Sequence, residues 1–106
     1  MLIIKNKFLP LGKNYYAINL FGILLAKGDC NSQIINHEKI HTRQMMELLI
    51  IPFYLLYLLE WLIKLIKYKN NYKAYKTISF EREAYSNQNN PSYLTSRKSF
   101  AFLRYL

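Results

Sequence analysis

The chain has 106 residues, so we expect one domain over residues 1–106. An apolar share of 52% and an aromatic share of 16% exclude a disordered tail. The net charge of +9 suits nucleic acid, an anionic membrane surface or an acidic protein as partner. The basic residues are densest over residues 64–76, directly after an apolar block that runs from Met45 to Ile66. A basic segment beside an apolar helix is typical of a cytoplasmic membrane boundary, so we expect membrane lipid and no nucleic acid as partner.

The first third of the chain predicts short strands. Residues 1–14 are expected to be extended and to end in a turn. Residues 15–27 are rich in aromatic and branched side chains, which predicts one or two strands with Gly22 at a bulge or hairpin bend. Turn residues occupy positions 28–32, and Ser32 is the expected N-cap of the next element.

The rest of the chain predicts helices. The first runs over residues 33–51, without internal Gly or Pro. Pro52 interrupts it and is typical of the first turn of a new helix, predicted over residues 52–68. A third helix is expected over residues 75–87, and the tail 93–106 has room for a short last one. The predicted fold class is therefore α+β, mostly helical, with short N-terminal strands before the helices.

The segment from Leu48 to Ile66 has the length of one membrane span, although Pro52, Glu60 and Lys64 interrupt it. Glu60 and Lys64 are spaced for an i, i+4 ion pair, and we expect them to pair. The alternative is a buried hairpin helix in an oligomer. We expect membrane association, with the functional site on the cytoplasmic side.

The segment His37-Glu38-Lys39-Ile40-His41 contains both histidines of the chain. Positions i and i+4 lie on one face of a helix, where two imidazoles can bind one tetrahedral Zn²⁺ ion. Glu38 is then placed to take a proton from a zinc-bound water. We expect His37 and His41 to be zinc ligands and Glu38 the catalytic base. The alternative is an amphipathic helix with two incidental histidines.

A catalytic zinc usually has a third protein ligand, and here it cannot be a third histidine. Among the downstream acids, Glu47 lies off the facing direction of the first helix and Glu60 lies inside the apolar block. This leaves Glu81 and Glu83, on the third predicted helix. A straight span would separate that helix from His41 by a membrane, so we expect the chain to turn back in a hairpin or re-entrant arrangement.

An HExxH helix, an apolar helix and a helix with the sequence Phe-Glu-Arg-Glu-Ala-Tyr follow one another over residues 33–87. This order resembles gluzincin metallopeptidases, in particular the CAAX-prenyl/heat-shock protease X family and the peptidase domain of BlaR/MecR-type antibiotic sensors. The resemblance implies a minimal zincin-like fold and zinc-dependent hydrolysis of peptide bonds at a membrane. In the first family the ligand Glu precedes an Ala by three positions, which favours Glu81, before Ala84, over Glu83. The Asp that usually follows that Ala is replaced by Tyr85.

The resemblance also implies an edge strand that binds the substrate backbone, for which residues 17–25 are the candidate. Tyr85 and Arg82 are candidates for stabilising the oxyanion. Because a chain of this size has little room for a substrate cleft, a partner subunit or a homo-oligomer is expected. Two other interpretations remain: a non-catalytic membrane zinc protein with a structural or signalling role, and a basic nucleic-acid binder.

Overall fold

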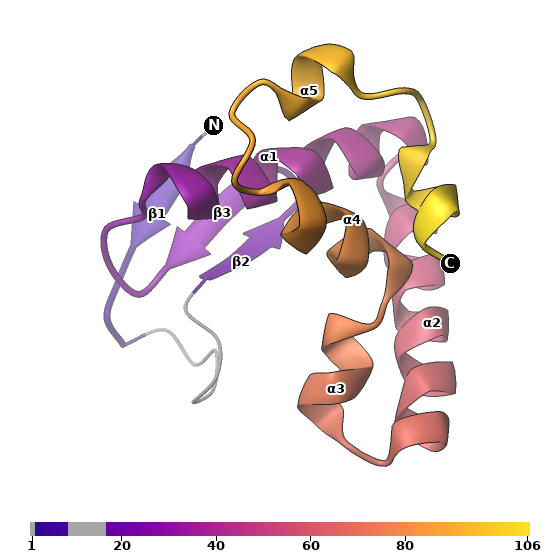
Figure 1. The fold of residues 1–106 in the computed structure, drawn as a ribbon. Coiled ribbons are helices and arrows are strands. Elements are labelled where there is room, and N and C mark those ends of the chain that lie inside the picture. The colour runs from indigo at the N-terminus through magenta and orange to yellow at the C-terminus, as the bar shows by residue number, and fades with distance from the viewer. Residues whose placement is uncertain (1, 9–16) are drawn as a thin grey trace.

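A computed structural model describes residues 2–8 and 17–106 of the chain. It confirms the predicted α+β, mostly helical class (Figure 1). The elements are β1 (Ile3–Lys5), β2 (Ala17–Leu20), β3 (Ile23–Ala26), α1 (Ser32–Glu47), α2 (Ile51–Tyr68), α3 (Asn71–Lys76), α4 (Ser79–Asn87), α5 (Tyr93–Ser96) and the 3-10 helix η1 (Ala101–Tyr105).

The three strands form one sheet in the order β1-β3-β2. β2 and β3 are antiparallel neighbours, so of the bulge and the hairpin bend expected at Gly22 the structure has the hairpin bend, and β1 adds to β3 in parallel. Phe21 and Gly22 form the bend with φ angles of 53° and 90°, as in a type I′ turn, where glycine is favoured at the second position. The turn expected near residue 14 lies outside the described residues.

The first helix differs from its prediction at both ends. Asn31, not Ser32, is the N-cap, and its Oδ1 accepts a hydrogen bond from the Ile34 amide at 2.8 Å. The helix ends at Glu47, because Leu49 and Ile50 adopt positive φ angles and turn the chain. The directions of α1 and α2 consequently differ by 113°. The chain turns back as expected, but through a corner rather than an antiparallel hairpin.

The predicted helix 75–87 is wrong in extent, because two helices, α3 and α4, cover this region. Thr77 Oγ1 donates to the Lys73 carbonyl at 2.8 Å where α3 ends. Glu60, from α2, accepts hydrogen bonds from Ser79 N at 2.9 Å and Ser79 Oγ at 2.6 Å where α4 begins. Glu60 therefore serves the N-terminus of α4, and the expected pair with Lys64 is not among the ion pairs of the described residues.

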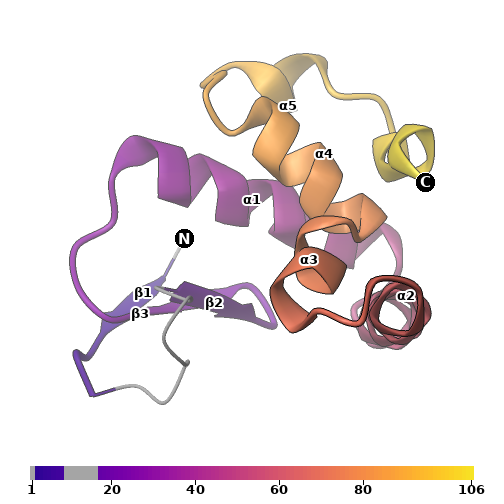
Figure 2. The ribbon, with the colours of Figure 1, turned by 60° about the horizontal axis from the view of Figure 1, so that its bottom comes forward.

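The hydrophobic core lies where α1, α2, α4 and η1 meet. It is built from buried apolar side chains of these elements and of the α3–α4 junction, namely Met45, Phe53, Ile78, Phe80 and Phe102. α1 lies over the sheet on one side and against α4 on another (Figure 2). One face of α1 is thus buried beside α4, and this is the face that carries the histidines.

None of the helices in the described ranges is, by itself, long and apolar enough to cross a membrane. α1 and α2 reach that length and composition only when taken together as a bent pair.

Candidate metal centre

Two side-chain nitrogen atoms and one carboxylate oxygen atom lie close together between α1 and α4. His37 and His41 lie one turn apart on α1, and Glu81 comes from the first turn of α4. The two Nε2 atoms are 3.1 Å apart, and each lies 3.0 Å from Glu81 Oε1. Zinc bonded tetrahedrally at about 2.0–2.1 Å holds its ligand atoms about 3.3–3.4 Å apart. A widening of the triangle by a few tenths of an ångström therefore suffices to hold the ion.

All three side chains are buried, and their charges are coupled. Burial acts to lower the pKa of His41, but the neighbouring Glu81 carboxylate outweighs it and raises the pKa to about 9. Burial acts to raise the pKa of Glu81, yet the two histidines hold it well below its usual range. Positive charge is thus favoured at this point, and in the protein alone a proton supplies it. A metal ion would displace that proton on binding.

Both histidines direct the same nitrogen toward the centre. His37 Nδ1 lies 2.8 Å from Gln88 Oε1, and His41 Nδ1 lies 2.8 Å from Gln44 Oε1. An amide oxygen only accepts, so each Nδ1 is the protonated nitrogen in the neutral ring. Once the proton at the centre is displaced, both Nε2 atoms would present lone pairs to a metal ion, which is the arrangement that metal-binding histidines need.

The orientation of Gln44 is in turn set by Glu83. Gln44 Nε2 donates to Glu83 Oε1 at 3.0 Å and to the Phe80 carbonyl at 3.1 Å. Because an ionised carboxylate only accepts, the NH₂ group of Gln44 must face Glu83 and its oxygen must face His41. Glu83 is kept ionised. Burial acts to raise its pKa, but hydrogen bonds from Arg97, Gln44 and Tyr93 outweigh burial and lower the pKa below its ordinary value.

This places the two candidate third ligands in different surroundings. Glu81 faces both histidines, whereas Glu83 binds Arg97 Nε at 2.5 Å and Tyr93 Oη at 2.7 Å. Arg97 also contacts the Glu47 carboxylate at 2.9 Å. Sequence reasoning missed the roles of Gln44, Gln88 and Arg97; the position of Gln44 three residues after His41 was the one available signal.

We expect Gln44→Met to weaken zinc binding about 10- to 100-fold while the fold is kept, because the thioether cannot accept strongly from His41 Nδ1. Competition with a chelating dye measures the affinity, and thermal denaturation checks the fold. Gln33→Met, at an exposed position of the same helix, is the matched control. Equal zinc affinity in Gln44→Met and wild type would contradict this orienting role.

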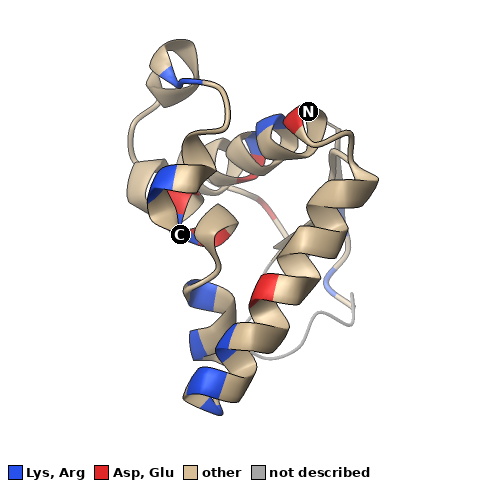
Figure 3. Ribbon diagram, turned by 90° about the vertical axis from the view of Figure 1, so that its right-hand side faces the viewer, with Lys and Arg blue, Asp and Glu red and all other residues tan. Residues whose placement is uncertain are grey.

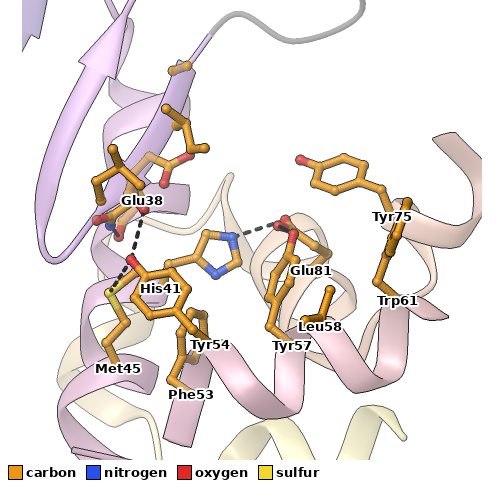
Figure 4. A pocket seen from close by; sticks show the side chains of 14 residues that line it. Glu38, His41, Met45, Phe53, Tyr54, Tyr57, Leu58, Trp61, Tyr75 and Glu81 are labelled. Carbon is orange, nitrogen blue, oxygen red and sulfur yellow. Dashed lines mark hydrogen bonds and ion pairs between the residues drawn. The ribbon is translucent and has the colours of Figure 1, made fainter. Parts of the chain in front are cut away.

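A cavity of about 690 Å³ opens beside the centre. Its lining includes Glu38, His41 and Glu81, and aromatic residues of α2 form much of its wall (Figure 4). Burial raises the pKa of Glu38 above its ordinary value, and the two histidines offset part of that rise. The Glu38 carboxylate has no hydrogen-bond partner among the described side chains and backbone groups. Glu38 therefore presents a carboxyl group of raised pKa to the cavity.

β2 lies along the same cavity. All four of its residues, Ala17–Leu20, line the cavity, and among the described strands β2 pairs only with β3. Asn19 ties the strand to α1, because its Nδ2 donates to the Glu38 carbonyl at 2.9 Å. Of the predicted edge segment 17–25, the residues of β2 form the open edge and those of β3 lie inside the sheet.

Two tyrosines that sequence reasoning missed contact the site. Tyr57 Oη donates to Glu81 Oε2 at 2.6 Å, which leaves Oε1 directed at the histidines. Tyr75 lines the cavity, and its hydroxyl lies 2.8 Å from that of Tyr85. The Tyr85 ring packs on the His37 ring with the centroids 4.4 Å apart, so Tyr85 helps to hold the His37 side chain in place. Arg82 is exposed and donates to the Tyr105 carbonyl, away from the centre.

A comparison of the chain with protein-family models, with characterised proteins and with solved structures returned no match. The resemblance to gluzincins therefore stays a prediction, and the function has to be inferred from the chemistry of the site.

Proposed function

We propose that this protein is a zinc-dependent metallopeptidase. The observation that carries the proposal is the triangle of His37 Nε2, His41 Nε2 and Glu81 Oε1, with edges of 3.0–3.1 Å, beside a cavity that Glu38 also lines. Two imidazoles and one carboxylate match the ligand set of hydrolytic zinc sites, and an adjoining cavity leaves room for water and substrate.

Each residue has a role in this proposal. Bound zinc would act as a Lewis acid toward a peptide carbonyl and toward water. Glu38 takes a proton from the water whose oxygen bonds to the carbonyl carbon, and it returns a proton to the amide nitrogen as the C–N bond breaks. Tyr57 holds Glu81 in place, and Gln44 and Gln88 hold the two histidines.

The substrate is proposed to bind as an extended peptide along β2. The edge of Ala17–Leu20 that faces away from β3 offers backbone groups for strand addition, and a substrate amide would replace the Tyr54 hydroxyl that donates to the Asn19 carbonyl at 3.2 Å. The wall formed by α2 accepts apolar side chains. Tyr75 directs its ring into the cavity (Figure 4), and we assign it the stabilisation of the carbonyl oxygen in place of Tyr85. Tyr85 then orients the Tyr75 hydroxyl.

The proposal is tested with zinc-loaded protein and a mixture of peptides of varied sequence, with products identified by mass spectrometry. We expect cleavage at defined bonds, with one oxygen from ¹⁸O-labelled water in each new carboxyl group. A chelator should stop cleavage and added zinc should restore it. Cleavage that persists without metal, or no cleavage of any peptide by zinc-loaded protein, would contradict the proposal.

A further inference from the structure

α2 exposes an apolar face, whereas its acidic residue points into the protein. Its side chains away from the rest of the protein are apolar without exception over more than three turns, and we call Leu55, Leu56, Leu59, Leu62, Ile63 and Ile66 the outer face. Ile66 is 78% exposed and Leu55 64%. The helix's acid, Glu60, instead points inward to Ser79. An exposed helix face in a water-soluble protein is normally polar, so the outer face calls for an apolar partner.

Lysines gather at one end of this face. Lys64 and Lys67 lie in the last turns of α2, and Lys69 and Lys73 follow in the turn and in α3 (Figure 3), whereas Lys76 turns its ammonium onto the Tyr85 ring, 3.4 Å from the centroid. No acidic residue occurs between Glu60 and Glu81 in the sequence. None of these lysines forms an ion pair with a carboxylate in the described part of the chain. We call Lys64, Lys67, Lys69 and Lys73 the lysine end.

We propose that the outer face of α2 inserts into the surface of an anionic lipid bilayer, with the lysine end among the lipid headgroups. The helix then lies along the membrane, as helices with an apolar face and flanking lysines do. Nucleic acid would neutralise the lysine end but leave the outer face in water. A second copy would cover the outer face but bring two chains of net charge +9 together. An anionic bilayer satisfies both features at once.

This placement has a consequence for the substrate, which rests on the proposed function. Leu58 and Trp61 of α2 line the cavity that contains Glu38. The cavity is therefore next to the membrane-facing helix, and the substrates it favours are peptide segments that lie at the bilayer surface.

The test is co-sedimentation of the full chain with vesicles of phosphatidylcholine, with and without about a third of phosphatidylserine. We expect binding to the mixed vesicles and much weaker binding to phosphatidylcholine alone. Replacing Lys67, Lys69 and Lys73 by Gln should weaken binding about a hundredfold, since each lysine near such a surface contributes about fivefold. Leu59→Gln with Leu62→Gln should weaken it roughly tenfold or more at both compositions.

Matched controls separate this surface from general charge and hydrophobicity. Lys39→Gln, Arg43→Gln and Lys98→Gln together remove the same charge from exposed positions elsewhere, and Leu103→Gln with Leu106→Gln removes apolar side chains exposed in the C-terminal segment. Both controls should bind the mixed vesicles within a fewfold of wild type. Equal losses in test and control variants would overturn the proposal. The proposal would also be overturned if the protein formed a dimer in solution that does not bind vesicles and that the Leu59 and Leu62 substitutions convert to monomers.

Glu38→Gln should bind vesicles as wild type does. The two proposals can also fail separately in wild type. Vesicle binding without peptide hydrolysis would contradict the proposed function alone, and hydrolysis without vesicle binding would contradict the membrane proposal alone.

Discussion

Glu38→Gln is expected to bind zinc as tightly as wild type and to hydrolyse peptides at least 10²- to 10⁴-fold more slowly, because the amide keeps the size of the side chain but cannot take up a proton. Glu38 lines the cavity and is no part of the triangle of metal-binding atoms, so its change should leave the metal in place. Initial rates of peptide cleavage and the zinc content of the same preparation measure the two effects together.

The neighbouring substitution Lys39→Gln is the control, since Lys39 is exposed on the same helix and should keep full activity. If Glu38→Gln cleaved peptides as fast as wild type, the proposed mechanism would be wrong. If wild type and variant both bind zinc and neither cleaves, the ion has a structural or signalling role instead.

The second large effect is expected in the zinc content of variants that lack a metal ligand. Wild-type protein incubated with zinc and then freed of excess should hold about one ion per chain, and His41→Ala and Glu81→Ala should hold almost none, because each removes one of three protein ligands. Zinc at a thousand times its dissociation constant should also stabilise wild type by about 4 kcal/mol, which both variants would lose. Elemental analysis and thermal denaturation with and without zinc give the two measurements.

Glu83→Gln distinguishes the two candidate third ligands. Glu83 contacts Gln44, Tyr93 and Arg97, so this variant should retain about one zinc per chain even if it is less stable. Circular dichroism shows which variants remain folded, and only folded ones are compared. Zinc lost from Glu83→Gln and kept by Glu81→Ala would reverse the ligand assignment.

The sequence by itself determined the features that depend on near neighbours along the chain. The i, i+4 spacing places His37 and His41 on one face of a helix wherever that helix packs, because the helical repeat is a local property. Gly22 marks the hairpin for the same reason, since the positive φ of a tight turn is set within a few residues. The α+β class followed from such local patterns.

Only the tertiary structure decided which distant groups meet at the site. Glu81 and Glu83 are two residues apart, yet one faces the histidines and the other faces Arg97, because α4 rotates them to different sides of its axis. The inward direction of Glu60 could not be read from the sequence either, since its partner Ser79 lies nineteen positions away. Hydrogen-bond partners of buried polar groups depend on how the elements pack, and periodicity along one element does not contain that information.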